Sequence, residues 1–199
     1  MRDTPVYQYA SFKYENLDMS KLGNNYCIFL DFDGVLHPDR AYMGRKGPVL
    51  TGDGDLFMWL PTLEKVLDDF PQCEIVLSTN WVRMLGFKRA CKYLPQKISG
   101  RVVGATWHSA ITRDPDLLNW WDTATRYEQI CRYVASTQIE NWVAIDDDVE
   151  GWPDVSLSRL VACKPQLGLG ELDAAMRLRE ILTGQRRADA IDFRSAKNL

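Results

Sequence analysis

Several common features are missing from this sequence, and each absence excludes a class of protein. No apolar run approaches the roughly 20 residues that a membrane-spanning helix needs. The first residues, 1–5, lack the apolar segment of a secretory signal. We therefore expect a cytoplasmic protein without a membrane partner.

Paired cysteines are also missing. The chain has five cysteines, an odd number, and none of them stands in a Cys-x-x-Cys pair. Most lie in apolar or helical surroundings, where a reduced cysteine behaves as a small core residue. We expect reduced core thiols here rather than a disulfide framework or a metal site. These cysteines are Cys27, Cys73, Cys91, Cys131 and Cys163.

An excess of positive charge and the glycine-rich nucleotide loops are missing as well. The formal net charge is -3, so the chain as a whole has no basic field that attracts nucleic acid. It contains no Gly-x-x-x-x-Gly-Lys-Ser/Thr and no Gly-x-Gly-x-x-Gly motif, which leaves a nucleoside-triphosphate loop or a dinucleotide site without support. Nucleic-acid binding is not favoured by the charge and would need a local surface.

What is present is the composition and periodicity of one soluble globular domain. The chain has 199 residues, of which 46% are hydrophobic and 26% charged. Apolar segments that predict β-strands cover 26–30, 74–79, 101–104, 142–145 and 159–162. Segments with helical periodicity cover 59–70, 82–93, 125–134 and 171–182. This alternation predicts an α/β fold of parallel βαβ units with right-handed crossovers.

The boundaries of the domain follow from composition. We expect a single catalytic domain over residues 25–184, preceded by an N-terminal extension at 1–24 and followed by a polar tail at 185–199. Glycines and prolines between about 38 and 57 are typical of turns and a flexible hairpin. Because this segment follows the first strand directly, we expect it to form a short flap over the end of that strand.

The end of the first strand places carboxylates next to a buried apolar segment. Asp31 and Asp33 follow residues 26–30, and Gly34 comes directly after them. The chain has three further Asp-x-Asp pairs, but this one stands behind a strand expected to be buried on both faces. Ligands of open α/β sheets bind beyond the carboxyl ends of strands. Two carboxylates there repel each other unless a hard divalent cation binds them, which predicts Mg²⁺.

Polar side chains follow two other predicted strands in the same way. Because the carboxyl ends of parallel strands meet at one edge of a sheet, we expect all these side chains to share one crevice. Together they supply a nucleophile, a metal site and donors for phosphate oxygens, as phosphoryl transfer to a carboxylate requires. They are Asp31, Asp33, Ser78, Thr79, Asn80, Asp146 and Asp147, with Arg126 in the first turn of the helix before the fourth strand.

In this order the motifs resemble those of the haloacid dehalogenase-like (HAD) hydrolase superfamily. The first motif, Asp-x-Asp-Gly-Thr/Val, is present as residues 31–35, and the second, an apolar strand ending in Ser or Thr, as 75–80. The fourth, an apolar strand ending in an acidic pair, is present as 143–147, and Arg126 matches the basic third motif. The resemblance covers about residues 26–182. It implies a three-layer Rossmann-like fold with a five-stranded sheet of order 5-4-1-2-3 and a minimal cap.

The resemblance also implies a role for each carboxylate. Asp31 would be the nucleophile that takes the phosphoryl group, and its other oxygen would bind Mg²⁺. Asp33 would protonate the leaving group and then activate water, while its backbone carbonyl coordinates the metal. Asp146 would be the third metal ligand, and Asp147 would hold a metal-bound water or the basic residue. Because superfamily members that break carbon–halogen bonds generally lack the second aspartate, Asp33 favours a phosphatase.

The remaining residues are expected around the phosphate. Thr79 would hydrogen-bond it, with Ser78 as the alternative because the register at the strand end is open by one residue. Arg126 would steady the phosphate and the nucleophile, although the superfamily more often has lysine there. Gly34 and Asn80 are expected to line the substrate site.

A closer resemblance is to small phosphatase-like domains that occur within bacterial RNA-repair proteins. These share the form of residues 30–36, a tryptophan soon after the second motif, here Trp81, and the pattern of residues 126–130. This resemblance adds a polynucleotide end as one expected substrate class.

Several of these residues also have a purely structural interpretation. The Thr79 hydroxyl is suited to capping the next helix, Arg126 to a solvated first turn, and Asp148 to capping a turn. His37 is positioned either to touch substrate or to make a structural hydrogen bond. Aromatic side chains between 106 and 122 are suited to stacking a base, but burial in the core is the commoner outcome; they include Trp107, Trp120 and Trp121, with His108 among them.

The leading hypothesis is therefore a Mg²⁺-dependent phosphoric monoester hydrolase that acts through an aspartyl-phosphate on Asp31. One alternative is a catalytically silent domain that binds phosphate or protein through the same fold. Another is a polynucleotide end-phosphatase in RNA repair, which the acidic composition disfavours. The sequence predicts a phosphorylated substrate without specifying its class, and it makes no prediction of oligomeric state.

Overall fold

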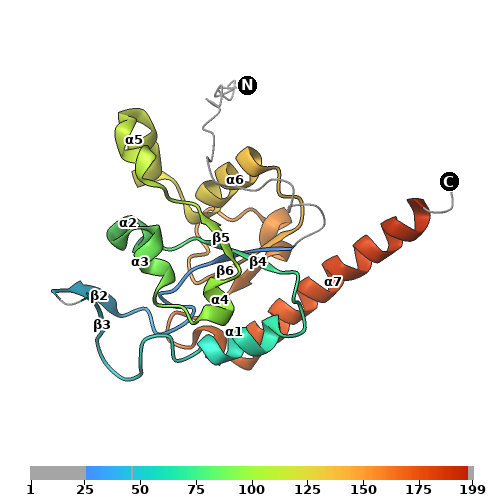
Figure 1. The fold of residues 1–199 in the computed structure, drawn as a ribbon, viewed down its shortest axis with the longest axis horizontal. Helices are drawn as coiled ribbons and strands as arrows, with labels where there is room; N and C mark the ends of the chain where they lie inside the picture. The colour runs from blue at the N-terminus through green and yellow to red at the C-terminus, as the bar shows by residue number, and fades with distance from the viewer. Residues whose placement is uncertain (1–25, 46, 197–199) are drawn as a thin grey trace.

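The computed structural model describes residues 26–45 and 47–196, with side chains as far as residue 184 (Figure 1). The N-terminal extension predicted at 1–24 lies outside the described residues. Among the described helices, none combines the length and the apolar composition that crossing a bilayer requires.

A five-stranded parallel sheet forms the centre of the fold. Its strands are β1 (Cys27–Leu30), β4 (Glu74–Leu77), β5 (Val102–Ala105), β6 (Trp142–Asp146) and β7 (Leu160–Ala162). They lie in the order β5-β4-β1-β6-β7, and each pairs in parallel with its neighbours. Numbered along the whole chain, this order differs from the expected 5-4-1-2-3, because the two strands of the flap take the numbers 2 and 3. Counted over the main sheet alone, the order is 3-2-1-4-5, which is the expected order read from the other edge.

The flap is a hairpin set apart from the main sheet. Strands β2 (Ala41–Gly44) and β3 (Gly47–Leu50) pair antiparallel, as the composition of this segment predicted (Figure 1). Gly47 adopts a φ of 125°, which only glycine tolerates readily, so it permits the chain to reverse between the two strands.

Helices connect the strands and cover the sheet. They are α1 (Leu60–Leu67), α2 (Asn80–Leu85), α3 (Phe87–Cys91), α4 (Gln96–Ser99), α5 (Pro115–Thr123), α6 (Arg126–Thr137) and α7 (Leu172–Ala196). Short 3-10 segments lie at Ser109–Arg113, Asp154–Arg159 and Gly168–Gly170. The capping box predicted at the start of α6 is present, since the Thr125 hydroxyl accepts from Glu128 N and Glu128 accepts from Thr125 N.

Three helical predictions need correction. The single helix expected over 82–93 is divided into α2 and α3, because Gly86 adopts a φ of 85° that ends the first helix. Helix α5 was not predicted, although its start carries a typical signal, an aspartate cap followed by a proline. The Asp114 side chain accepts hydrogen bonds from Asp116 N and Leu117 N, and Pro115 is the first residue of the helix. Helix α7 continues to Ala196 through residues expected as a tail, because 185–196 contain neither glycine nor proline.

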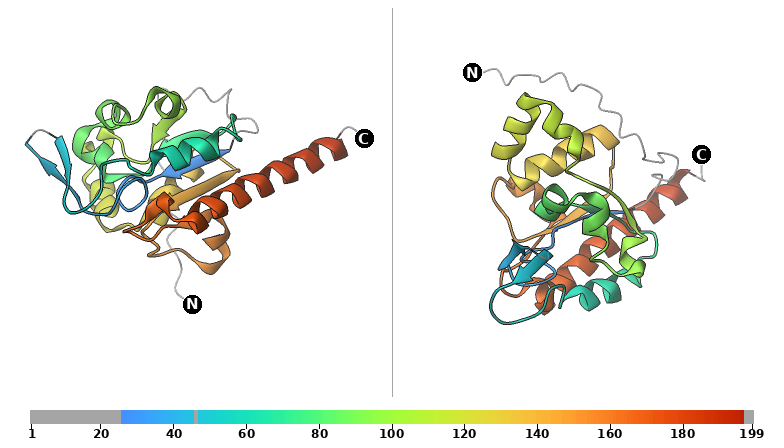
Figure 2. Two further views of the ribbon diagram at one scale, coloured as in Figure 1. Left: turned by 90° about the horizontal axis from the view of Figure 1, so that it is seen from below. Right: turned by 60° about the vertical axis from the view of Figure 1, so that its left-hand side comes forward.

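Helices lie on both faces of the sheet, which gives the fold three layers (Figure 2). Along β1 the side chains alternate, as they do in every strand. Ile28 and Leu30 belong to a cluster with residues of α1 and α7, whereas Cys27 and Phe29 belong to a second cluster with residues of α6. Because both faces are filled, polar side chains gather at the ends of the strands, where the site lies.

Candidate active site

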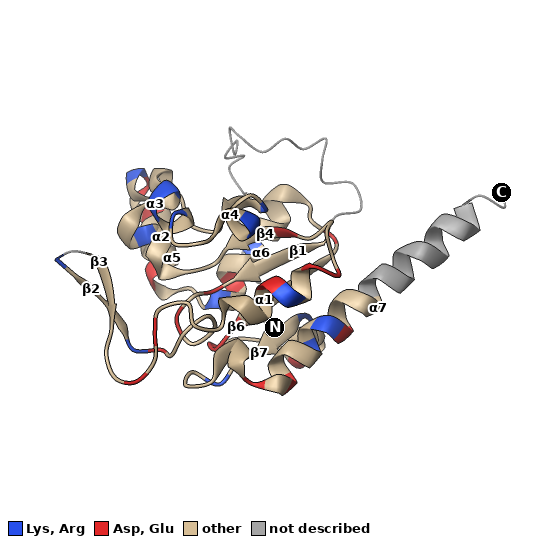
Figure 3. Ribbon diagram, turned by 60° about the horizontal axis from the view of Figure 1, so that its bottom comes forward, with Lys and Arg blue, Asp and Glu red and all other residues tan. Residues whose placement is uncertain are grey.

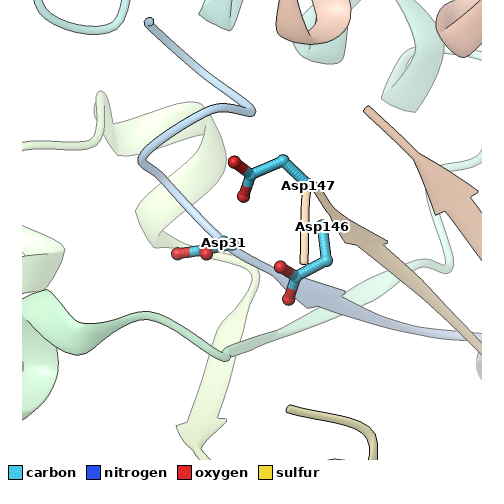
Figure 4. Close-up of side chains that lie close together, drawn as sticks. All are labelled: Asp31, Asp146 and Asp147. Carbon is cyan, nitrogen blue, oxygen red and sulfur yellow. The ribbon is translucent and has the colours of Figure 1, made fainter. Parts of the chain in front are cut away.

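Three carboxylates meet at the carboxyl edge of the sheet. Asp31 follows β1, Asp146 ends β6, and Asp147 comes next; one oxygen from each lies within 4.8 Å of the others (Figure 4). The register explains the meeting, since Leu30 pairs with Ile145 on the neighbouring strand. The residues that follow this pair therefore stand side by side, at about the spacing of adjacent strands, ~4.8 Å.

Arg126 supplies the positive charge of this cluster. Its Nη2 lies 3.2 Å from Oδ2 of Asp31, and its Nε lies 3.1 Å from Oδ2 of Asp146. The side chain is only 10% exposed, so it is no solvated first-turn residue. Burial acts to lower the pKa of Arg126, but the charges of Asp31 and Asp146 outweigh it and raise that pKa overall. The guanidinium therefore stays charged beside the carboxylates.

One guanidinium does not balance three carboxylates. Burial raises the pKa of Asp31, opposed by Arg126, and raises the pKa of Asp146 well above its usual range, with repulsion from Asp31 adding to the effect. Burial and repulsion from Asp31 also raise the pKa of Asp147, to about 6. The protein alone thus leaves the cluster short of positive charge.

The same atoms fit a hard divalent cation. Oδ2 of Asp146 is buried and, although it lies close to Arg126, has no hydrogen bond there because the geometry is unfavourable. It therefore keeps a free lone pair beside carboxylate oxygens of Asp31 and Asp147. An all-oxygen donor set of this kind suits Mg²⁺. Within the described residues, this is the cluster of carboxylates with the spacing of a metal site.

Gly34 lets Asp147 approach the cluster. Its φ is 67°, and a Cβ placed on it would lie 2.3 Å from Oδ2 of Asp147. Any larger residue would be strained and would displace the Asp147 carboxylate. The glycine of the first motif thus acts through the space it leaves beside the Asp147 carboxylate.

The polar residues after β4 have different surroundings. The Thr79 hydroxyl accepts a hydrogen bond from Trp81 N over 3.4 Å and so caps α2. Burial has the largest effect on the pKa of Asp31 and raises it, whereas a hydrogen bond with the Thr79 side chain has a smaller effect and lowers it. Ser78 is fully buried, and its Oγ has no partner among the described residues. Asn80 begins α2 and is exposed. Of the two alternatives, Thr79 is the hydroxyl beside Asp31.

The side chain of Asp33 lies apart from the three carboxylates. Nε1 of Trp81 donates to its Oδ2 over 2.8 Å, and Nε2 of His37 lies 3.0 Å from its Oδ1. The Asp33 side chain is 24% exposed, whereas His37 is fully buried. The two acids of the first motif therefore occupy separate environments, as different chemical roles require.

The structure also gives the surroundings of four other residues that had two interpretations. His37 is fully buried and contacts Asp33, and Asp148 caps a turn by accepting from Glu150 N over 3.0 Å. Trp107 and Trp121 are buried and pack edge to face at 5.2 Å, so both are core residues. Sequence reasoning noted Trp81 but not its contact with Asp33. The available signal was weak, since 48 residues separate the two.

Comparison with known proteins agrees with the motifs. A family model described as "HAD domain in Swiss Army Knife RNA repair proteins" matches residues 27–174 of the chain. The match contains all the site residues named above. No curated protein and no solved structure matches the chain.

Proposed function

We propose that this chain, which belongs to the family of HAD domains in Swiss Army Knife RNA repair proteins, is a Mg²⁺-dependent phosphatase with Asp31 as its nucleophile. One observation carries the proposal: Asp31 lies between Arg126 and two further carboxylates, while Asp33 stands apart with a partly exposed side chain. This arrangement separates a nucleophile from an acid–base group, which is the division of roles that phosphate ester hydrolysis needs.

Mg²⁺ held by Asp31, Asp146 and Asp147 would neutralise these carboxylates and the incoming phosphate. The chain's own residues orient the nucleophile around it. Phe32 N donates to Oδ1 of Asp31 over 2.7 Å, and Arg126 contacts Oδ2. These fixed donors hold the carboxylate in one orientation and stabilise charge as it moves to the phosphate.

Hydrolysis then takes two steps. In the first, an oxygen of Asp31 bonds to phosphorus, the bond to the leaving oxygen breaks, and that oxygen takes the proton of Asp33. In the second, Asp33 accepts a proton from water, the water oxygen bonds to phosphorus, and the bond to Asp31 breaks to release phosphate. Thr79 and Arg126 would bind the phosphate oxygens in both steps.

Hydrolysis of an aryl phosphate with and without Mg²⁺ tests this proposal, with Asp31→Asn as the inactive control. We expect turnover only by the wild type with Mg²⁺. Equal activity of the two proteins would refute the mechanism. Mg²⁺ binding without turnover on a broad panel of phosphate esters would instead favour the silent phosphate-binding domain.

A specific observation also favours a polynucleotide end as substrate. Residues 75–113 contain no Asp or Glu, and the basic residues in that stretch are Arg83, Lys88, Arg89, Lys92, Lys97, Arg101 and Arg113. Lys and Arg accordingly gather on α2 and α3 (Figure 3). The net charge of -3 therefore conceals a basic surface, which weakens the argument from composition against nucleic acid.

Part of this basic surface is free to bind anions. Arg83 and Lys97 are paired with Asp122 and Asp68. Lys88, Arg89 and Lys92, by contrast, are exposed and form no ion pair with any described residue. We name these three residues the α3 basic patch. Exposed basic side chains without an acidic partner suit phosphodiester groups.

The α3 basic patch is linked to the site through aromatic side chains. Phe87 and Tyr93 are partly exposed next to it. The Tyr93 ring packs on Trp81 at 5.2 Å, and Trp81 in turn contacts Asp33. Exposed aromatic rings stack on bases of single strands. A strand whose terminal phosphate occupies the site therefore has charge and stacking surface along its path.

Replacing the α3 basic patch tests this substrate class. The variant with alanine at Lys88, Arg89 and Lys92 should hydrolyse a 3′-phosphorylated oligonucleotide with a lower kcat/KM and a smaller salt dependence. Its activity on an aryl phosphate should not change. Lys65→Ala on α1 is the matched control. Equal effects on both substrates would contradict a strand-binding role, and hydrolysis of mononucleotides faster than of the oligonucleotide would contradict the substrate class.

A further inference from the structure

Asp33 is held by two side chains that have no role in the proposed mechanism so far. Trp81 Nε1 donates to Oδ2 of Asp33 over 2.8 Å, and His37 Nε2 lies 3.0 Å from Oδ1. An ionised carboxylate can only accept hydrogen bonds, so in that state one oxygen accepts from Trp81 Nε1–H and the other from the Nε2–H tautomer of His37. We name His37 and Trp81 the Asp33 clamp.

Packing fixes both members of the Asp33 clamp. His37 is fully buried, and Trp81 is 3% exposed. The Trp81 ring contacts the rings of Phe32, His37, Phe57 and Tyr93 at centroid distances of 5.4, 5.6, 5.3 and 5.2 Å. Such edge-to-face and tilted contacts restrict rotation of the indole. Neither N–H group can turn away from Asp33 without displacing neighbouring aromatic rings.

The backbone at Phe57 supports this reading. Its φ of 63° lies in the left-handed region, which bulky residues rarely adopt. The Phe57 ring packs against His37 at 5.1 Å and against Trp81 at 5.3 Å. Unfavourable backbone conformations of this kind persist where the surroundings enforce them, often near functional sites. Here the conformation places a ring that closes the aromatic packing around the Asp33 clamp.

The clamp consists of buried groups that hold a partly exposed carboxylate. Its two donors are enclosed, whereas the Asp33 side chain is 24% exposed. The Asp33 carboxylate is therefore held by buried donors and still has a solvent-exposed part that a substrate can reach. A carboxyl group held in this way can exchange a proton at its exposed part while its orientation stays constant.

We infer that His37 and Trp81 are positioning residues that orient Asp33 for proton transfer to the leaving-group oxygen. This inference rests on the proposed phosphatase function. When the bond from phosphorus to the leaving oxygen breaks, the proton of Asp33 passes to that oxygen, and the two ring N–H groups stabilise the carboxylate that forms. The benefit depends on how strongly the leaving oxygen needs a proton, and this dependence can be measured.

The experiment compares an alkyl phosphate with 4-nitrophenyl phosphate in the presence of Mg²⁺. The alkoxide needs a proton as it leaves, whereas 4-nitrophenolate leaves readily without one. The measured quantity is kcat/KM, because it reports phosphoryl transfer to Asp31 and not the later hydrolysis. We expect Trp81→Phe and His37→Leu to lower kcat/KM for the alkyl phosphate by about 10- to 100-fold, and for 4-nitrophenyl phosphate by less than about threefold.

Conservative and remote variants serve as controls. His37→Gln keeps an N–H donor near the position of Nε2 and should restore most of the alkyl phosphate activity. Trp121→Phe changes another buried tryptophan, 6% exposed, and should leave the ratio of the two substrates unchanged. Circular dichroism and urea unfolding identify variants that do not fold; if His37→Leu is one of them, Trp81→Phe and His37→Gln still provide the comparison.

The outcomes separate this inference from the proposed function. Equal losses on both substrates in folded Trp81→Phe would overturn the positioning role while the phosphatase proposal stands. Failure of the wild type to exceed Asp31→Asn on either substrate would overturn the proposed function itself. A loss confined to the alkyl phosphate, with recovery in His37→Gln, is the expected result.

Discussion

Replacing Asp147 by asparagine should stabilise the metal-free protein, although it removes a proposed metal ligand. Burial, together with repulsion from Asp31 and Asp39, raises the pKa of Asp147 from its usual 3.8 to about 6. The folded state thus holds this proton more tightly than the unfolded chain does. At about 1.4 kcal/mol per pH unit, keeping the carboxylate ionised above pH 6 costs the folded protein about 3 kcal/mol before screening by solvent.

Solvent reduces this cost, because Asp147 is only half-buried. We expect Asp147→Asn to raise the free energy of unfolding by about 1 to 2 kcal/mol at pH 8. For a chain of this length that corresponds to about 2 to 8 °C in Tm. Both states of the wild type carry the proton below about pH 4, so the difference should fall as the pH decreases from 6 to 4.

Urea unfolding in EDTA at pH 8, 6 and 4 provides the assay. Asp148→Asn is the matched control, because it removes the same charge from an exposed neighbour outside the carboxylate cluster. Added Mg²⁺ should then stabilise the wild type more than Asp147→Asn, since the variant lacks one carboxylate ligand. A variant that is less stable than the wild type in EDTA at pH 8, or a difference that does not change with pH, would refute the reasoning.

Three further predictions follow from the same cluster. Gly34→Ala should displace the Asp147 carboxylate, because the new Cβ would lie 2.3 Å from its Oδ2. Urea unfolding should show a free energy of unfolding lower by about 1 to 3 kcal/mol, and calorimetry should show a weaker Mg²⁺ affinity. Gly184→Ala is the control and should show neither effect, because nothing lies within 4 Å of its new Cβ. Arg126→Gln should destabilise the metal-free protein by about 3 to 5 kcal/mol at pH 8, and a loss under about 1 kcal/mol would argue against a buried ion pair with Asp31 and Asp146. Mg²⁺ binding should release protons, since the pKa of Asp147 is raised to about 6. Calorimetry should therefore show a binding enthalpy that depends on the ionisation enthalpy of the buffer, and an affinity that rises between pH 5 and 7. A constant affinity over this range would contradict the prediction.

The sequence by itself determined the layers of the fold and the location of the site. Apolar segments such as Cys27–Leu30 must be buried on both faces, so they form the central strands. Local signals were also sufficient at the start of α6, because a capping box involves only neighbouring residues. Charged side chains beside a buried strand can reach water only at the ends of the strand. Carboxylates that directly follow an apolar segment therefore mark a strand end, and a local sequence pattern was enough to identify them.

Local reading failed where a single residue overrode the pattern. Gly86 divides a helix that periodicity predicted as continuous, because its backbone lies in a region that helical residues cannot occupy. The predicted strand order counted the five strands of the main sheet alone, so it differs from the order numbered along the whole chain, in which the flap strands are β2 and β3. The net charge also gave no sign of the basic surface on α2 and α3. The value of -3 sums the acidic residues elsewhere in the chain with the stretch 75–113, which contains no Asp or Glu.

Only the tertiary structure decided which side chains meet. Arg126 and Asp31 are 95 residues apart in the chain, and Trp81 and Asp33 are 48 apart, yet both pairs are in contact. The register of β1 with β6 sets Asp31 beside Asp146, and the missing side chain of Gly34 admits Asp147. Periodicity and spacing describe a strand or a turn one at a time. Distances between side chains depend on strand register and close packing, which arise only when the whole chain has folded.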